Sequence, residues 1–136
     1  REFALQGLYQ WIVGGSDFPE IAGHLPDLEG YGRADQDFCM KLIEGVIEER
    51  DALLKHLLPH LDRPFDQLSP IEACLLLIGT YELSRFPETP YRVILNESIE
   101  MAKRFGGTDG HKYVNGILDH VAAALRPNEF RGGNIP

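Results

Sequence analysis

Apolar residues recur at steps of three and four positions along most of this chain, the spacing that places side chains on one face of an α-helix. The clearest stripe follows Pro90 and consists of Tyr91, Ile94, Leu95, Ser98, Met101, Ala102 and Phe105. A second stripe consists of Tyr113, Val114, Ile117, Leu118, Val121 and Leu125. Gly106 follows the first stripe, where a left-handed cap is expected, and Thr108 or Asp109 can cap the second helix. We therefore predict two helices between Pro90 and Arg126, joined by a tight glycine loop.

The same spacing predicts further helices in the first two thirds of the chain. They cover residues 1–13, a short segment at 18–25 and a long segment at 34–58. Gly14 and Gly15 stop the first of these, and Ser16 or Asp17 can cap the second. Ser69-Pro70-Ile71-Glu72 has the form of a capping box, so another helix begins there and ends near Arg85. Because residues 73–78 are apolar all round, this helix is predicted to be the buried centre of the second half.

The size and apolar content of the chain fit one globular, all-helical domain. It has 136 residues, of which 43% are hydrophobic and 25% charged. Asp62-Arg63-Pro64 is predicted to be the hinge between a sub-bundle at 1–62 and another at 63–127, and residues 128–136 to form a mobile tail. No apolar run approaches the roughly 20 residues that span a membrane. The chain starts at Arg1 without Met, so we expect the true N-terminus to be missing.

The net charge of −8 is unevenly distributed. Residues 1–72 carry 6 Lys and Arg against 14 Asp and Glu, a net −8, whereas residues 73–136 carry 7 against 7. A locally basic patch can still bind phosphate in such a protein, but long-range steering of an anionic ligand is weak. Cys39 and Cys74 lie within apolar stripes, and we expect them to be buried free thiols, as in a cytoplasmic protein.

The predicted loop between the last two helices combines a helix start, cations and aromatic rings. A helix start has free N–H groups that suit an anion, and the cations around it are Lys103, Arg104, His111 and Lys112. Phe105 and Tyr113 could present flat faces to unstacked bases. These residues indicate either a contact for single-stranded RNA or, as is common for such spacing, two core rings beneath a solvated charged surface.

We predict no catalytic site, no cofactor and no metal site. The chain has no Ser or Cys nucleophile beside a base in a motif that we recognise. Asn96, Glu97 and Asn115 lie close to the apolar stripes, and they are either a catalytic cluster or, as we expect, buried struts that hydrogen-bond the last two helices together. His56 and His60 have the spacing of zinc ligands on a helix, but a clear third ligand is missing.

Several of these segments resemble the NusB family of bacterial transcription antitermination factors. The resemblance is carried by Pro90–Glu97, Ala102–Gly106 and His111–Asp119, and more loosely by Ala4–Trp11 and Tyr81–Leu83. It implies an all-α, NusB-like fold of about seven helices in two small packed bundles. It also implies binding to the boxA element of single-stranded RNA as a heterodimer with the ribosomal protein NusE. Other Nus factors and RNA polymerase are then indirect partners.

The residue patterns and the resemblance together assign site residues. The RNA contact is assigned to Arg1, Lys103, Phe105, Lys112 and Tyr113, with Gly110 allowing close backbone approach and Asp109 capping the helix while repelling phosphate. The protein-partner surface is assigned to Tyr9, Glu72 and Leu76. The family usually carries an arginine-rich arm before the first helix, of which only Arg1 could remain. It often has an arginine where this chain has Leu77, which is therefore either a change on the partner surface or a simple core residue.

Two other functions fit the resemblance. Several ribosomal RNA methyltransferases begin with a NusB-like domain, so the chain could be the RNA-recognition domain of such an enzyme. It could also be a homodimeric helical protein whose RNA surface is masked. Our main expectation is a cytoplasmic RNA-binding factor that is not an enzyme and has no membrane contact.

Overall fold

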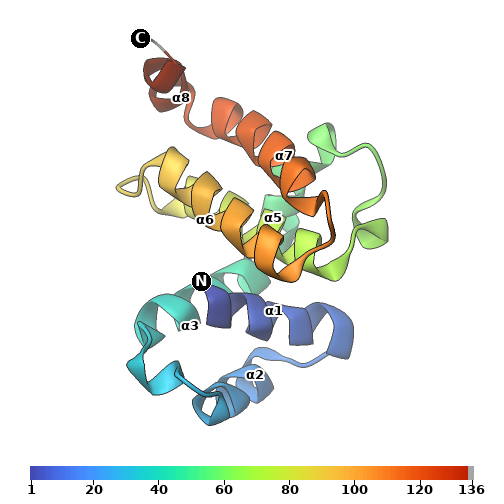
Figure 1. Ribbon diagram of the computed structural model, residues 1–136, viewed down its shortest axis with the longest axis vertical. Helices are drawn as coiled ribbons and strands as arrows, with labels where there is room; N and C mark the ends of the chain where they lie inside the picture. Colours follow the sequence, from blue (N-terminus) through green and yellow to red (C-terminus); the bar gives the residue numbers. More distant parts are fainter. Residues whose placement is uncertain (135–136) are drawn as a thin grey trace.

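The computed structural model describes residues 1–134, and every regular element among them is helical (Figure 1). The α-helices are α1 (Glu2–Gly14), α2 (Phe18–His24), α3 (Gln36–Glu48), α4 (Arg50–Leu57), α5 (Pro70–Arg85), α6 (Tyr91–Phe105), α7 (Gly110–Leu125) and α8 (Pro127–Asn134). Short 3-10 turns lie at η1 (Leu25–Asp27), η2 (Tyr31–Arg33), η3 (Leu58–His60) and η4 (Phe65–Gln67). The predicted all-helical fold is therefore confirmed.

Helix α5 lies between the two halves of the molecule. In Figure 1, α1, α2 and α3 form the lower half, and α6, α7 and α8 form the upper half. Helix α5 packs against α1, α3 and α4 on one side and against α6 and α7 on the other. The buried apolar side chains of both halves form one continuous core. The division into sub-bundles at residues 62 and 63 stays a prediction.

The sequence of α5 explains its central place. The Ser69 hydroxyl accepts a hydrogen bond from the Glu72 backbone N–H at 3.2 Å, so the predicted cap starts the helix. The eleven consecutive residues 73–83 are all buried, including the polar Thr80 and Glu82. Neighbouring helices approach closely at glycines, and a Cβ added at Gly45 in α3 would overlap the ring of Tyr81. The helix is thus enclosed on all sides.

One arginine closes the C-terminal end of α5. The guanidinium of Arg126, only 9% exposed, donates hydrogen bonds to the backbone carbonyls of Glu82, Leu83 and Phe86. It also donates to the carbonyl of Thr89 in the following turn. The last carbonyls of a helix have no partner within it, and burying them unpaired is costly. Arg126 therefore allows this helix end to be buried.

The long helix predicted at residues 34–58 is wrong, because it is divided at Glu49 into α3 and α4. The apolar stripe of α3 ends at Val46, and the next positions on that face hold Glu49 and Arg50. The Glu49 carboxylate accepts hydrogen bonds from Arg85 on α5, with a shortest N–O distance of 2.6 Å. The helix is interrupted at Glu49, whose φ and ψ are −102° and 15°, and it resumes with Leu53 and Leu57 buried in the core.

The predicted left-handed cap at Gly106 is also wrong. Its φ and ψ are −95° and −175°, an extended conformation, whereas Gly15 after α1 is left-handed with φ 70°. Gly106 is suited to its place for another reason. A Cβ there would lie 2.7 Å from the carbonyl oxygen of Ala102, so a side chain would force the turn away from α6.

Most of the predicted mobile tail is instead helix α8. The Glu129 carboxylate accepts a hydrogen bond from the Tyr91 backbone N–H at 2.7 Å, a group that Pro90 cannot cap from its own side chain. Glu129 also pairs with Arg126 at 3.0 Å, and the ring of Phe130 packs on that of Tyr91. These contacts fold the segment onto the start of α6. Residues 135 and 136 of the predicted tail lie outside the described residues.

Both cysteines are free and buried, as predicted. Burial raises the pKa of the Cys74 thiol to about 12, so the reactive thiolate is almost absent at neutral pH. Within residues 1–134, no helix is long and apolar enough to cross a membrane.

The enclosure of α5 predicts a large cost for truncating its side chains. Leu76 is fully buried, and we expect Leu76→Ala to lower the free energy of unfolding by about 2–5 kcal/mol. The reason is lost apolar burial together with the cavity that remains. Urea unfolding followed by circular dichroism measures this change. A cost below that of Val93→Ala, which truncates a 42% exposed side chain, would contradict the packing.

Candidate nucleic-acid and partner interface

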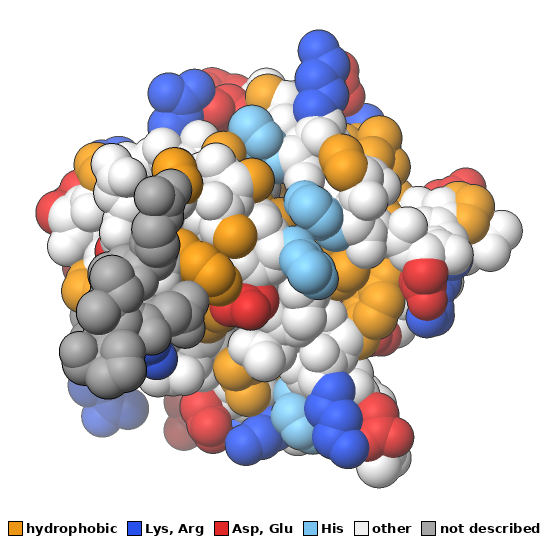
Figure 2. All heavy atoms as spheres, turned by 90° about the horizontal axis from the view of Figure 1, so that it is seen from above, with side chains coloured by type: hydrophobic (Ala, Val, Ile, Leu, Met, Phe, Trp, Pro, Cys, Tyr) orange, Lys and Arg blue, Asp and Glu red, His pale blue; other side chains and the backbone are white. Residues whose placement is uncertain are grey.

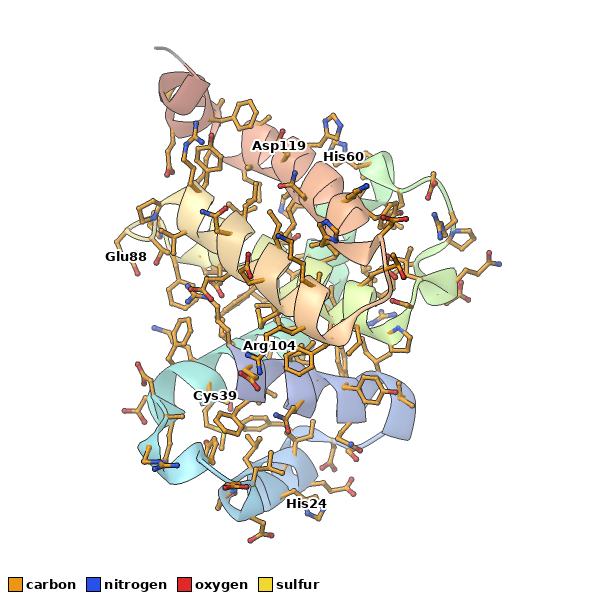
Figure 3. The ribbon with its side chains drawn as sticks, viewed as in Figure 1. His24, Cys39, His60, Glu88, Arg104 and Asp119 are labelled. Atoms are coloured by element: carbon orange, nitrogen blue, oxygen red, sulfur yellow. The ribbon has the colours of Figure 1, made fainter. Side chains whose placement is uncertain are left out.

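The loop between α6 and α7 rests on α1, which places the predicted RNA contact between the two halves of the molecule. Arg104 in the last turn of α6 pairs with Glu2 in the first turn of α1, with a shortest N–O distance of 3.0 Å (Figure 3). Phe105, the last residue of α6, lines a depression of about 400 Å³ together with Leu5 and Tyr9 of α1. The side of the loop that faces α1 is therefore held in place by contacts, whereas its opposite side faces solvent.

Each lysine and arginine of this surface has a carboxylate partner. Lys103 lies 3.7 Å from Glu100, and Lys112 lies 3.4 Å from Asp109. A further pair, which the sequence reasoning missed as part of this site, is Arg63 with Asp62 at 2.9 Å. These ion pairs join the pair of Arg104 and Glu2, and they are largely exposed. Exposed pairs contribute only about 0–1 kcal/mol, so a phosphate group can compete for the cations.

The two aromatic residues predicted to stack on bases differ in their surroundings. Phe105 is 38% exposed, and the guanidinium of Arg104 lies 4.8 Å from its ring centre. Tyr113 is half-buried, and Arg63 covers it with its guanidinium 4.9 Å from the ring centre. Two guanidinium–aromatic pairs thus flank the loop, an arrangement that can accept a base by stacking.

The hydroxyl of Tyr113 ties the start of α7 to the segment before α5. It donates a hydrogen bond to the Asp62 carboxylate at 3.0 Å. Partial burial, and then this bond to the carboxylate, raise the pKa of Tyr113. The hydrogen bonds from Arg63 and from Tyr113 lower the pKa of Asp62. Asp62 is therefore ionised and Tyr113 protonated at neutral pH, the states that this contact requires.

The first turn of α7 is a poorer anion site than the sequence predicted. Asp109 is at the N-cap position, but its side chain makes no cap hydrogen bond. Glu72 lies beside Gly110, because its carboxyl carbon would be 3.5 Å from a Cβ added there, an ordinary van der Waals contact. With Asp109 and Glu72 both near the helix start, a bound phosphate has to rely on the surrounding cations.

The partner residues separate into two kinds. Tyr9 is half-buried and lines the depression below Phe105, and Glu72 is half-buried beside the α7 start. The predicted RNA and partner surfaces therefore adjoin. Leu76 is fully buried, so its assignment to a partner surface is wrong, because α5 is enclosed on all sides at that turn. Leu77 is also fully buried and is a core residue.

Arg1 is not part of the loop site. Its guanidinium makes two hydrogen bonds of 2.9 Å to the carboxylate of Glu82, whose side chain is 1% exposed, and lies over the ring of Phe38. Glu82 is ten residues beyond Glu72 on α5, about 15 Å along the helix. The assignment of Arg1 to RNA is therefore not supported. The sequence alone could not show that Arg1 pairs with the buried carboxylate of Glu82, which is 81 residues away along the chain.

The polar residues expected to be buried struts are at the surface. Asn96, Glu97 and Asn115 are all exposed, so the strut prediction is wrong. The helices α6 and α7 are joined by apolar contacts beneath them.

The histidines do not form a metal site with each other. His60 stacks in parallel on His120, with ring centres 5.4 Å apart. Figure 2 shows histidine side chains gathered on the face of the molecule that is seen from above. Residues 1–134 contain no group of three His, Cys, Asp or Glu side chains that could hold a metal ion.

Comparisons with known proteins agree on one family. A model of the NusB family matches residues 1–123. The chain is similar to the transcription antitermination protein NusB of Dechloromonas aromatica (strain RCB), with 56% identity over 129 residues, 95% of this chain and 79% of that protein. It is 54% identical to that of Burkholderia cenocepacia (strain HI2424), over 95% of this chain and 89% of that protein. In fold it is similar to the solved structure of T. maritima NusB, with a TM-score of 0.80, 24% identity, and coverage of 95% and 92%.

The geometry around Glu82 predicts that Arg1 acts on stability. We expect Arg1→Ala to lower the free energy of unfolding by about 3 kcal/mol, because it leaves a buried carboxylate without its partner. Chemical denaturation measures this loss, and adding Glu82→Gln to Arg1→Ala should recover part of it. Arg85→Ala, which breaks an exposed pair with Glu49, is the matched control and should cost much less. Equal costs for both arginines would contradict the assignment.

Proposed function

This chain belongs to the NusB family of transcription antitermination proteins, and on that premise we propose that it binds boxA-type single-stranded RNA together with the ribosomal protein NusE. The pair assembles an antitermination complex on RNA polymerase, with other Nus factors. It works by binding and not by catalysis, in the cytoplasm where transcription occurs. One observation carries the proposal: exposed cations and a ring at the α6–α7 loop adjoin a depression on α1.

The RNA surface consists of Lys103, Arg104, Phe105, Lys112, Arg63 and Tyr113, which we call the loop surface. Its cations bind phosphates by exchanging an exposed carboxylate partner for a phosphate oxygen. The cost of this exchange is low because solvent screens each pair. The ring of Phe105, already stacked on Arg104, offers its free edge and face to an unpaired base. All of these residues except Arg63 lie in residues 73–136, whose net charge is zero.

The partner surface lies on α1, next to the loop surface. Tyr9 lines the depression that also receives Phe105, so a protein seated there would touch both the partner residue and the RNA-facing ring. Further along α1, Ile12 and Val13 are 36% and 54% exposed beside a second depression that Leu77 and Phe65 line. Exposed apolar side chains next to a hollow are typical of a protein contact. The adjoining loop surface and α1 surface therefore support the proposal that this side of the molecule binds RNA and a protein partner together.

The alternative of a methyltransferase domain is the weaker one. The relatives at 54–56% identity are named as antitermination proteins, and this chain spans 79% and 89% of their lengths. Those relatives are therefore too short to contain an additional nucleotide-binding catalytic domain.

Removing the carboxylate at the start of α7 should tighten RNA binding. Asp109 pairs with Lys112 at 3.4 Å and makes no cap hydrogen bond, so Asp109→Asn frees a cation at little cost to the helix. We expect binding of a boxA-type RNA to become about threefold tighter. The slope of log affinity against log salt should also steepen, because one more phosphate contact forms. Fluorescence anisotropy across a salt series measures both.

The matched control for this substitution is Asp27→Asn. Asp27 is an exposed carboxylate in η1, remote from the loop surface, and its loss changes the net charge by the same amount. Equal tightening by both variants would indicate a general charge effect. Unchanged or weaker binding by Asp109→Asn, with the fold intact, would contradict the proposed geometry.

Stacking on the exposed ring should contribute more than any single cation. We expect Phe105→Ala to weaken boxA-type RNA binding by about 1–3 kcal/mol, the range for base–aromatic stacking. Titrations with and without NusE separate loss of RNA contact from loss of partner contact. Leu58→Ala, which truncates a 52% exposed side chain in η3, is the control and should leave RNA binding unchanged. Wild-type affinity in Phe105→Ala would remove the ring from the RNA surface.

A further inference from the structure

Away from the loop, α6 and α7 enclose a polar depression that the loop surface does not include. Its volume is about 200 Å³, and it is lined by Tyr91, Arg92, Leu95, Asn96, Asn115 and Asp119. Asp119 is labelled on α7 in Figure 3, in the upper half of the molecule. Tyr91 and Leu95 are buried and form the apolar floor. We call this depression the seam pocket.

Three side chains of the seam pocket, those of Asn96, Asn115 and Asp119, have unused hydrogen-bonding groups. All three are exposed, and none of them makes a hydrogen bond or an ion pair to a side chain that the structure describes, whereas Arg92 already contacts the ring of Tyr91. The two carboxamides come from facing helices and each offers both donors and an acceptor, whereas the carboxylate only accepts. Three unused hydrogen-bonding groups around one hollow suit a small planar ligand with both donors and acceptors.

A glycine on α7 connects the seam pocket to the loop surface. Lys112, Gly116 and Asp119 are spaced by four and three residues, so they lie along one face of α7. Gly116 is exposed, and a Cβ added there would meet nothing within 4 Å. Glycine in the middle of a helix is destabilising, and no packing within the described chain requires it here. It leaves a bare strip of helix backbone, about 10 Å from Lys112 to Asp119, over which a chain can pass.

We propose that the RNA strand bound at the loop surface continues over Gly116, and that the seam pocket receives one of its bases, with adenine or cytosine preferred to uracil. This rests on the proposed function and extends it to a base-reading site. Asn side chains pair with the N6 and N7 edge of adenine, and carboxylates accept from the N4 amino group of cytosine. Uracil has no amino group, and its one donor on the pairing edge, N3–H, lies between two carbonyl oxygens that the carboxylate of Asp119 would repel.

The direct test uses boxA-type RNA extended at one end or the other by a short run of adenosines, cytidines or uridines. With the wild-type chain, adenosine or cytidine extensions at one end should bind about 5- to 50-fold more tightly than uridine extensions. In an Asn96→Ala, Asn115→Ala double variant this difference should disappear, while the unextended RNA binds as before. Both side chains are exposed, so the fold should persist, and circular dichroism checks it.

The outcomes distinguish this inference from the proposed function. If the unextended RNA fails to bind even with NusE present, the proposed function is wrong. If it binds, but extensions of all three kinds at both ends bind alike, the seam pocket reads no base and the inference is overturned. The inference is also overturned if the double variant weakens capture of NusE and leaves every RNA affinity unchanged, which would indicate a protein contact.

A second variant tests the path over the helix. Gly116→Ala should raise the melting temperature, because alanine is the better helix former, and yet weaken binding of the favoured extended RNA severalfold by blocking the bare strip. Gly23→Ala is the matched control: it lies in α2 with nothing within 4 Å of an added Cβ, and should affect only stability. A stabilised Gly116→Ala that binds the extended RNA with wild-type affinity would contradict the proposed path.

Discussion

The burial of α5 on all sides is the constraint on which the rest of the structure depends. A helix that is apolar all round can be stable in water only if other helices cover every face, and here α1, α3, α4, α6 and α7 do so. The buried carboxylate of Glu82 and the carbonyls at the end of α5 also need partners, and two arginines supply them. Arg1 pairs with the buried Glu82, and Arg126 binds the carbonyls at the end of the helix. Arg1 and Arg126 thereby lie at the same end of α5.

This arrangement determines where ligands can bind. Because residues 73–83 of α5 are buried, this part of the helix cannot contact a ligand. The surfaces available for binding are on the helices around it, at the α6–α7 loop and along α1. The loop surface lies over the N-terminal end of α5, where Glu72 meets Gly110. Its cations are held in exposed pairs with carboxylates, and in the mode of binding that we propose, phosphate groups replace these carboxylates. A chain with a net charge of −8 can bind nucleic acid in this way, through short-range exchange instead of long-range attraction.

The sequence correctly predicted the positions of most helices, because these depend on local periodicity. It failed where a contact with a residue far away in the sequence determines the local structure. Stripes and caps located the helices, and Asp17 and Ser69 cap as expected. The stripe could not show that the long helix would be interrupted at Glu49, which pairs with Arg85, nor that Glu129 would fold the tail onto α6. For the candidate site, the sequence correctly predicted that the residues of the α6–α7 loop lie close together, because they are neighbours along the chain. It missed Arg63, which reaches Tyr113 across 50 positions of sequence and carries no motif of its own.

The central claim is that RNA follows the loop surface and the α6–α7 seam while α5 stays closed. The most direct measurement is the change in backbone amide NMR shifts when boxA-type RNA is added to the isotope-labelled protein. We expect the changes to be concentrated at residues 103–119 and at Arg63, with the amides of α2 and of the α5 core unchanged. Changes centred on α2, or spread through residues 73–83, would mean that the RNA binds elsewhere or opens the core, and would contradict the account.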